Sequence, residues 1–367
     1  MKTQAAVSRE GTPAPVIEEI DLEAPRADEV LVRIVASGIC HTDLRCHAGR
    51  GMPVPRPIVL GHEGAGVVEA VGEAVTDIAP GDHVVLSGAS CGACPSCLRN
   101  RPSYCREGLR LSFGGARADG SSPLSQNGER IHGPFFGQSS FARYAVASAR
   151  SAVKMPKDAP LDVLGPLGCG IITGAGTVLE AFKLRPGQSI AVFGAGGVGL
   201  SAIMAARLAG ASRIAAVDVN PARLALAEEL GATATVDASR GDVSAALKDA
   251  LPSGYDFAFN TTNLPAVFDQ ALGCLGTEGA LAFVTTPAGD WAPPMMTLLA
   301  GGRTIKGVLG GDAAPKLFLP MLVEAWRDGR FPLDRLVTRY PFAAIADAFA
   351  EAESGGAVKP VLVMDEA

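Results

Sequence analysis

The amino-acid sequence predicts an α/β protein with two domains, one rich in β-strands and one built on a doubly wound parallel sheet. The chain has 367 residues, about two to three times a typical single domain, so two packed cores are expected. Up to about residue 160, short apolar segments alternate with Gly and Pro, as in strands joined by turns. Strand-like and helix-like segments then follow one another, which is typical of a parallel sheet.

In the first part, the residues EVLVRIV from Glu29 to Val35 alternate between apolar and polar, as a half-buried strand does. The segments VVLS, from Val84, and FARYAV, from Phe141, predict two further strands. Short strands separated by turns predict a small barrel-like or sandwich fold.

The second part predicts alternating strands and helices. Strands are expected at 189–194, 213–219, 255–262 and 279–286, and helices at 198–210, 221–232 and 264–275. A last helix over 342–355 and a last strand over 359–364 end the chain.

Composition and charge exclude several classes of protein. The chain is 48% hydrophobic and only 19% charged, which is typical of a folded protein rather than a disordered one. Its net charge of -6 argues against nucleic acid as a partner. The N-terminal residues lack the apolar core of a secretion signal, and no segment predicts a membrane span. We therefore expect a cytoplasmic protein that binds neither nucleic acid nor membrane.

A glycine-rich turn follows the first strand of the second part. Its glycines are Gly194, Gly196, Gly197 and Gly199. A GxGxxG turn between a strand and a helix predicts a dinucleotide site, with the pyrophosphate at the helix N-terminus. Asp218 ends the next strand, where a carboxylate binds the adenosine ribose and repels the 2′-phosphate of NADP, so NAD is expected. Arg223 lies nearby and weakens this argument, because a guanidinium can accept that phosphate. A purely structural turn is the alternative.

Four of the eight cysteines lie in one short segment. Cys91, Cys94, Cys97 and Cys105 have the spacing of a closed tetrahedral zinc site with a structural role. The alternative, free or disulfide-linked cysteines, fits a reducing compartment less well. A second site requires distant residues: Cys40, His62 with Glu63, and Cys169 are candidates in Gly-bordered turns. Two thiolates and one imidazole would leave a fourth position open, as catalytic zinc requires.

The chain resembles the zinc-containing medium-chain alcohol dehydrogenases over essentially its whole length. The motifs follow the order of that family: GICHTD, GHEGAGVVEAVG, the four-cysteine loop, GPLGCGIITGAGT, VFGAGGVGLSAIMAARLAG with VDVN, and KPVLVM. FGGARADG, FFGQSSFA and GPLGCGIITGAG are most similar to the aryl and allylic alcohol dehydrogenases of the benzyl alcohol and geraniol type. The resemblance implies a GroES-like catalytic domain and a Rossmann domain.

The resemblance implies roles for residues around the second zinc. Cys40, His62 and Cys169 correspond to the ligands of the catalytic zinc, and Asp43 to the carboxylate that orients the imidazole. Glu63 corresponds to a glutamate beside the metal. Two zinc ions per chain are therefore expected.

The resemblance also implies residues that contact the substrate proton and the cofactor. Thr42 corresponds to the hydroxyl that receives the alcohol proton. His41 and Lys359 correspond to pyrophosphate contacts, and Thr173 and Val198 to the residues that line the nicotinamide.

The expected proton relay differs from the family pattern. Many members have a histidine where this chain has Arg45, and an arginine stays protonated in proteins. His47 is a possible substitute, although an exposed loop histidine is the simpler interpretation.

The expected substrate is a small alcohol or aldehyde, with a benzylic or allylic primary alcohol favoured. Ser87 stands where some small-alcohol enzymes have a bulky aromatic residue, which predicts more room. Four phenylalanines are candidates for an aromatic lining, with core packing as the alternative: Phe113, Phe135, Phe136 and Phe141. The sequence also leaves open a polyol or a formaldehyde adduct as substrate, or a nucleotide-binding relative without enzymatic activity.

The expected domains are a split catalytic domain, residues 1–167 and 307–367, and an NAD-binding domain, residues 168–306. The segment MMTLLAGGRTIKG resembles the subunit contact at the sheet edge in this family. We therefore expect a homodimer or a homotetramer.

Overall fold

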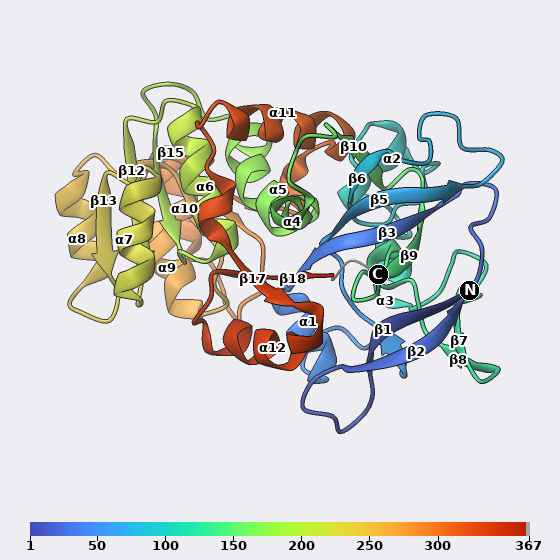
Figure 1. Cartoon of the computed structure of the whole chain (residues 1–367). Coiled ribbons are helices and arrows are strands. Elements are labelled where there is room, and N and C mark those ends of the chain that lie inside the picture. The colour runs from blue at the N-terminus through green and yellow to red at the C-terminus, as the bar shows by residue number, and fades with distance from the viewer. Residues whose placement is uncertain (365–367) are drawn as a thin grey trace. The chain divides into compact units, whose positions relative to one another are not determined.

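The computed structural model describes residues 1–364 and forms two compact units (Figure 1). Unit 1 consists of Met1–Cys169, Ala314–Glu324 and the chain from Asp334 onward, and unit 2 of Gly170–Ala313 and Ala325–Leu333. The expected domain limits at residues 167 and 307 stay a prediction, and residue 367 lies outside the described residues.

Unit 1 contains two sheets of mostly antiparallel strands. Their strand orders are β4-β1-β2-β7-β8 and β10-β6-β5-β3-β18-β17, and β9 also pairs with β3. The strands are β1 (Lys2–Ser8), β2 (Val16–Leu22), β3 (Glu29–Gly38), β4 (Ile58–Val59), β5 (Gly64–Val71), β6 (His83–Leu86), β7 (Leu124–Gln126), β8 (Glu129–Ile131), β9 (Tyr144–Ser148), β10 (Ala152–Met155), β17 (Val337–Pro341) and β18 (Lys359–Val363). These sheets confirm the expected β-rich domain.

The helices of unit 1 are short, apart from α12. They are α1 (His41–His47), α2 (Pro95–Leu98), α3 (Gly108–Phe113), α4 (Leu161–Leu164), α12 (Ile345–Ser354), η1 (Pro102–Tyr104), η2 (Phe135–Gly137), η3 (Gly165–Gly168) and η7 (Phe342–Ala344). Helix α11 (Pro315–Arg327) and turn η6 (Leu333–Leu336) are divided between the units. The core combines buried residues of β1, β2 and β3 with Phe135, Phe141 and Phe342. Because β3 leads almost directly into α1, this core fixes where α1 begins.

Unit 2 contains one six-stranded parallel sheet, which confirms the expected doubly wound domain. Its order is β13-β12-β11-β14-β15-β16. The strands are β11 (Ser189–Phe193), β12 (Arg213–Asp218), β13 (Ala234–Asp237), β14 (Tyr255–Asn260), β15 (Leu275–Phe283) and β16 (Thr304–Gly307). The sequence order reverses between β11 and β14, and ligands of such sheets bind at the carboxyl ends beside this reversal.

Helices cover the sheet of unit 2, as Figure 1 shows for α7 and α8 beside β12 and β13. The helical segments are α5 (Gly170–Gly176), η4 (Thr177–Ala181), α6 (Gly197–Leu208), α7 (Pro221–Leu230), α8 (Val243–Ala250), α9 (Pro265–Gly273), α10 (Met295–Gly301) and η5 (Gly310–Asp312). One hydrophobic core joins Val243 and Leu247 of α8 and Leu272 of α9 to Phe193 and Val217 of the sheet.

Within residues 1–364, no single helix has both the length and the apolar composition needed to cross a membrane. The bent pair Leu161–Gly168 and Gly170–Ala181 passes that test by length and composition only.

Several expected elements begin or end at other residues in the structure, and the reason is clear for two of them. The strand expected from Phe141 begins at Tyr144, because the backbone N–H of Phe141 donates to Leu60 O and that of Arg143 to Gln4 O. The helix expected over 264–275 ends at Gly273, because Leu275 already belongs to β15.

Candidate functional site

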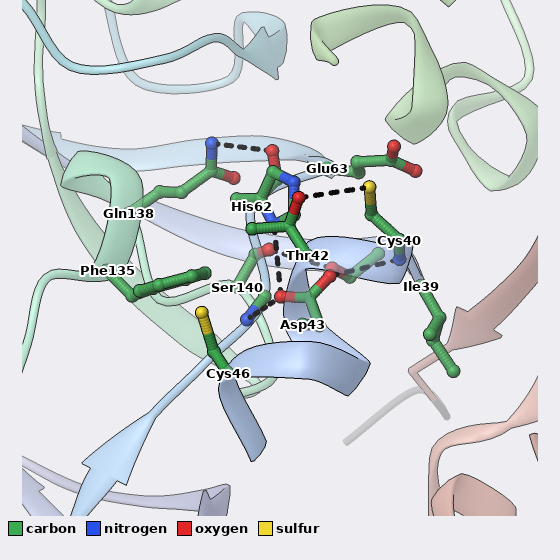
Figure 2. A network of polar contacts seen from close by, with 12 residues as sticks. Ile39, Cys40, Thr42, Asp43, Cys46, His62, Glu63, Phe135, Gln138 and Ser140 are labelled. Atoms are coloured by element: carbon green, nitrogen blue, oxygen red, sulfur yellow. Dashed lines mark hydrogen bonds and ion pairs between the residues drawn. The ribbon is translucent and has the colours of Figure 1, made fainter. Parts of the chain in front are cut away.

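The end of β3 places Cys40 at the N-terminus of α1. The Ile39 N–H donates to Pro360 O at 2.9 Å, which fixes the chain just before the helix. Cys40 is the residue that caps the helix, and its N–H donates to Asp43 Oδ2 at 3.0 Å (Figure 2). A carboxylate in the first turn also interacts favourably with the positive end of the helix dipole. The position of the Cys40 sulfur is thus set by a sheet and a capped helix.

Asp43 links this helix to His62, which lies between β4 and β5. Asp43 Oδ1 accepts hydrogen bonds from Gly61 N and from His62 Nδ1, both at 3.0 Å (Figure 2). Asp43 and His62 are 0% and 1% exposed. Because Nδ1 donates to the carboxylate, the lone pair of the imidazole is on Nε2, as a metal ligand requires. Nε2 is buried and makes no hydrogen bond in the described part of the chain.

Four potential ligand atoms converge at this point. Those of Cys40, His62, Glu63 and Cys169 all lie within 4.8 Å of one another. The Cys169 thiol donates to the Cys40 sulfur and holds the pKa of Cys40 well below its usual value, while the same contact and burial raise the pKa of Cys169. Two sulfurs, one imidazole nitrogen without another partner and a nearby carboxylate fit a zinc ion.

Glu63 and Lys359 form a buried ion pair. Lys359 Nζ lies 3.0 Å from each Glu63 carboxylate oxygen and donates to Ile39 O at 3.2 Å. Burial raises the pKa of Glu63, although the ammonium opposes that shift. Burial lowers the pKa of Lys359, but attraction to Glu63 and the two thiols outweighs burial and raises it overall. Lys359 therefore has a partner inside unit 1, and its expected role in pyrophosphate binding stays a prediction.

The other candidates on α1 differ in exposure. Thr42 is half-buried and accepts a 3.8 Å hydrogen bond from the Cys40 thiol, whereas His41 and Arg45 are exposed. His47 is buried, which contradicts the expectation of an exposed loop histidine. Its Nδ1 lies 2.8 Å from Ser8 Oγ and its Nε2 3.0 Å from Thr12 O, because the C-terminal turn of α1 packs against β1 and the loop that follows it. The expected substitute relay thus has both ring nitrogens engaged in structural hydrogen bonds.

Two of the four expected aromatic residues pack on the imidazole of His62, and a third packs on those two. Phe136 stacks on it with ring centroids 4.5 Å apart, and Phe135 meets it edge-on at 5.7 Å. Phe113 lies 5.0 Å from Phe136. Phe113 and Phe136 are half-buried. The structure therefore places an aromatic wall beside the candidate metal ligands.

The remaining two pocket candidates lie in the interior. Phe141 is 0% exposed and packs edge-on against Phe349 at 5.8 Å, so the expectation that it lines the substrate pocket is wrong. Core packing, the alternative interpretation, explains this residue. Ser87 is 4% exposed, and its hydroxyl donates to Ser151 O at 3.0 Å.

The four-cysteine loop brings its sulfurs together. Cys94 Sγ lies 3.5 Å from Cys97 Sγ and 4.0 Å from Cys105 Sγ, and Cys91 Sγ lies 4.0 Å from Cys97 Sγ. A tetrahedral site with Zn–S distances of about 2.3 Å needs sulfurs about 3.8 Å apart. Backbone N–H groups of Arg106 and Cys97 lower the pKa of Cys94 to about 6, which favours the thiolate that binds metal. The loop fits a structural zinc.

The glycine turn lies at the carboxyl end of β11. Gly194 has a φ of 92°, and a Cβ there would lie 2.3 Å from Thr261 Oγ1, so only glycine fits. The Ala195 N–H donates to Asp218 Oδ2 at 2.6 Å, and the Asn220 N–H donates to Asp218 Oδ1 at 2.9 Å. Asp218 therefore holds the turn in addition to its expected role at the ribose.

The other expected nucleotide contacts lie on helices of unit 2. Gly196 caps α6, which begins at Gly197 and contains Gly199. Thr173 on α5 and Val198 on α6 lie on helices that pack closely, since a Cβ on Gly174 would lie 2.0 Å from Val198 O. Arg223 is half-buried in the first turn of α7.

Two residues in contact with these sites are not among the site residues that the sequence predicts. Gln138 bonds the backbone on both sides of Glu63. The Thr261 hydroxyl donates to Phe193 O at 2.9 Å and so supports the glycine turn. The motif FFGQSSFA contains Gln138, but no local pattern indicates the role of either residue, because each acts on a segment that is distant in sequence.

Comparison with known proteins is consistent with this geometry. Residues 26–157 match the model of the alcohol dehydrogenase GroES-like domain, and residues 197–324 match that of the zinc-binding dehydrogenases. Geraniol dehydrogenase from Castellaniella defragrans is 47% identical over 367 residues, which cover 99% of this chain and 98% of the relative.

Two crystal structures cover the whole chain and are covered completely by it. Benzyl alcohol dehydrogenase from Acinetobacter calcoaceticus is 42% identical, with a TM-score of 0.95. An alcohol dehydrogenase zinc-binding domain protein from Burkholderia ambifaria is 49% identical, with a TM-score of 0.97.

A β-rich unit with two cysteine-containing metal sites and a doubly wound unit with a glycine turn define a zinc- and dinucleotide-dependent oxidoreductase. The extent of the matches makes the assignment more specific. The chain belongs to the zinc-containing medium-chain alcohol dehydrogenase family, with a GroES-like domain and a Rossmann domain. It is therefore an enzyme that oxidises alcohols.

Proposed function

We propose that this enzyme oxidises primary aryl or allylic alcohols to aldehydes with NAD, and that it reduces the aldehydes in the reverse direction. The observation that carries the proposal is the convergence of Cys40, His62 and Cys169, in which the imidazole Nε2 has no hydrogen-bond partner among the described residues. Polyols or formaldehyde adducts would need a more polar pocket, and a relative without enzymatic activity would not need this set of ligands.

The chain's own residues prepare the site for its zinc. Cys40, His62 and Cys169 would hold the metal, and Asp43 keeps the imidazole in the tautomer that can bind it. When bound, zinc supplies a Lewis acid that makes the alcohol hydroxyl more acidic, and oxidised nicotinamide accepts a hydride. Lys359 balances the charge of Glu63 next to the ligands.

Thr42 is the group to which we assign the alcohol proton. Its hydroxyl is half-buried near the Cys40 sulfur, where it can accept a proton and donate another one. Arg45 stays protonated and His47 bonds Ser8 and Thr12, so neither supplies a relay. We infer that Thr42 passes the proton on toward solvent without Arg45 or His47.

Phe113 and Phe136, the two half-buried residues of the aromatic wall, support an aryl or allylic substrate. Aromatic faces pack well against flat unsaturated groups. Geraniol, the alcohol in the name of one relative, is allylic, and benzyl alcohol, in the name of another, is a primary alcohol on an aromatic ring. Ser87, whose side chain is small, leaves more room than a bulky aromatic residue at that position.

NAD is the proposed cofactor because Asp218 ends β12 beside the glycine turn, where its negative charge disfavours a 2′-phosphate. Arg223 lies five residues later in the first turn of α7, and its positive charge opposes this preference.

We further propose that the enzyme forms a homodimer or a homotetramer in the cytoplasm. β16 is the last strand of its sheet, and the adjacent helix α10 exposes Met295, Met296 and Leu299. An open sheet edge beside exposed apolar side chains favours pairing with a second copy. All eight cysteines are free thiols, which suits a reducing compartment.

A substrate panel combined with a zinc count tests the proposal. We expect two zinc ions per chain and a kcat/KM with NAD that is at least about tenfold higher for benzyl, cinnamyl or geraniol-type alcohols than for ethanol. Cys169→Ser is expected to reduce the zinc content to one per chain and to abolish turnover while NAD binding stays measurable. Retained turnover with one zinc per chain, or equal efficiency with ethanol, would contradict the proposal.

A further inference from the structure

We propose that Gln138 is a positioning residue for His62, and that it keeps the imidazole in the geometry that retains zinc. The inference rests on the proposed function of His62 as a ligand. Gln138 contributes no atom to the group of four potential ligands and acts through the backbone around Glu63.

The side-chain amide of Gln138 bonds the backbone before and after Glu63. Its Nε2 donates to His62 O at 3.1 Å (Figure 2). Its Oε1 accepts from Gly64 N at 3.0 Å, and its Nε2 makes a longer bond of 3.5 Å to Ser87 O. Gln138 is 1% exposed, so water does not replace these bonds easily. One planar group therefore fixes both peptide units that flank Glu63.

The neighbours of Gln138 bond the preceding part of the same segment. Ser139 Oγ donates to Val59 O at 2.6 Å, and Phe141 N donates to Leu60 O at 3.1 Å. Ser140 N donates to Gly61 O at 2.9 Å. Each of residues 138–141 thus makes at least one hydrogen bond to the segment 59–64. We call residues 138–141 the clamp segment.

Close packing explains two glycines of the motif GHEG. Gly61 has a φ of 89°, and a Cβ there would lie 2.4 Å from Phe141 N. A Cβ on Gly64 would lie 2.7 Å from Ser140 Cβ and 3.0 Å from Gln138 Oε1. Both glycines leave space for the clamp segment, which indicates that the two segments form one packed unit.

The imidazole is also held from the sides. Phe136 stacks on the ring at 4.5 Å and has a φ of 50°, a left-handed conformation that is rare for a bulky residue. Asp43 bonds Nδ1. Phe136 and Asp43 hold the ring, and Gln138 holds the backbone. Together they orient Nε2 of His62 toward Cys40 and Cys169.

Zinc retention measures this role without relying on catalysis. Gln138→Met keeps the volume of the side chain but removes all three of its hydrogen bonds, and Gln138→Glu keeps only an acceptor for Gly64 N. Loss of a group that orients a ligand typically weakens metal binding about 10–100-fold. We expect Gln138→Met to release one zinc per chain to 1,10-phenanthroline at least about tenfold faster than the wild-type enzyme, and Gln138→Glu to be intermediate.

Ser139→Ala is the matched control. It removes two buried hydrogen bonds of the Ser139 hydroxyl, one donated to Val59 O, three residues before His62, and one accepted from Phe135 N, but none to the peptide units that flank Glu63. We expect Ser139→Ala to lower the Tm but to release zinc at the wild-type rate. The zinc of the four-cysteine loop is expected to stay bound in every variant.

If Gln138→Met released zinc at the wild-type rate, the proposed role of Gln138 would be overturned. If Gln138→Met does not fold, Gln138→Glu provides the test. Zinc release from Gln138→Glu at the wild-type rate would then overturn the role of Gln138. A wild-type enzyme that holds only one zinc would instead contradict the proposed function, so the two failures are distinguishable.

Discussion

The ion pair between Glu63 and Lys359 lies in the interior of unit 1, where an isolated charge is strongly unfavourable. Glu63 is 0% and Lys359 6% exposed. The ammonium group has three acceptors, two from Glu63 and one from Ile39, which matches its three hydrogens. The pair stabilises the fold only while both partners are present, because each neutralises the other.

Lys359→Met is expected to lower the free energy of unfolding by about 3–5 kcal/mol, because it leaves the Glu63 carboxylate buried without a counter-charge. Urea unfolding followed by circular dichroism measures the loss. The double variant Glu63→Gln/Lys359→Met is the control and should recover most of the lost stability. If Lys359→Met had the same free energy of unfolding as the wild type, this would contradict a buried, ionised Glu63.

Asp218 combines a structural and a proposed discriminating role. Its two carboxylate oxygens accept from Ala195 N and Asn220 N, so the same group fixes the glycine turn and the start of the segment that leads to α7. Ala195 is 1% exposed, and its N–H loses a buried partner if the carboxylate is removed.

Asp218→Ser is expected to weaken binding of both dinucleotides and to shift the NAD-to-NADP ratio of kcat/KM toward NADP by about tenfold or more. The loss of repulsion on the 2′-phosphate gives the shift, and the weakened turn gives the general loss. Steady-state kinetics with both cofactors separates the two effects. An unchanged ratio would exclude Asp218 from cofactor discrimination.

At the scale of elements, α1 is fixed at both ends. Cys40 and Asp43 hold its N-terminus. At its C-terminus, Arg56 donates from Nη2 to Cys46 O at 2.7 Å and to His47 O at 2.5 Å, where a cation complements the helix dipole. The same guanidinium donates from Nη1 to Ser8 Oγ at 3.0 Å and so ties the helix to β1. α1 is therefore a rigid support for the candidate ligands.

His47 makes this support sensitive to acid. Burial lowers the pKa of His47 below its usual 6.5, and the nearby Arg56 lowers it further, although the Thr12 carbonyl opposes the shift. Below pH 6.5 the unfolded chain binds a proton there that the native enzyme does not, so the free energy of unfolding falls as the pH falls.

His47→Gln, which can still bond Ser8 and Thr12, is expected to flatten this loss of stability between pH 7.5 and 5. Each proton taken up on unfolding contributes a slope of at most about 1.4 kcal/mol per pH unit. Urea titrations at several pH values measure the slope. His83 and His132, whose pKa values are also lowered by burial, contribute to the slope in the same direction, and His83→Gln is a control outside α1. An unchanged slope in His47→Gln would contradict the assignment.

The elements differ in how far a sequence can predict them. The parallel sheet follows from local apolar patterns, and the strand from Ser189 to Phe193 with its glycine turn lies where the pattern places it. The clamp segment does not follow from such patterns. Gln138 bonds residues that lie 74 and 76 positions away, and its φ-strained neighbour Phe136 is held by tertiary contacts with no local signal.

At the scale of the whole molecule, α10 and β16 provide the test of assembly. Leu299 is 77% exposed on α10. Leu299→Lys is expected to shift the enzyme from an oligomer to a monomer, because it places a charge in the proposed apolar contact. Light scattering coupled to gel filtration measures the mass.

Leu317→Lys is the control for this prediction. Leu317 is 71% exposed and lies on α11 in unit 1, outside α10 and β16, so its variant should keep the wild-type mass. A monomeric wild-type enzyme, or an unchanged mass in Leu299→Lys, would contradict the proposed contact.

The two metal sites also differ in what their sequence could predict. Spacing alone predicts the four-cysteine loop, because all its ligands lie between Cys91 and Cys105. The second site combines Cys40, His62 and Cys169 from distant segments, so the resemblance to a family was needed to assemble it. The same resemblance did not show that Lys359 bonds Glu63 or that Phe141 is buried, because both depend on packing.

The close fit between residues 59–64 and residues 135–141 constrains how this enzyme can be recombined with its relatives. Gly61 and Gly64 leave space for one particular partner segment, and Gln138 supplies bonds at matching positions. A crossover placed between the two segments would combine halves from different parents and separate a matched pair. Libraries of chimeric dehydrogenases should therefore inherit both segments from one parent, even though about seventy residues lie between them.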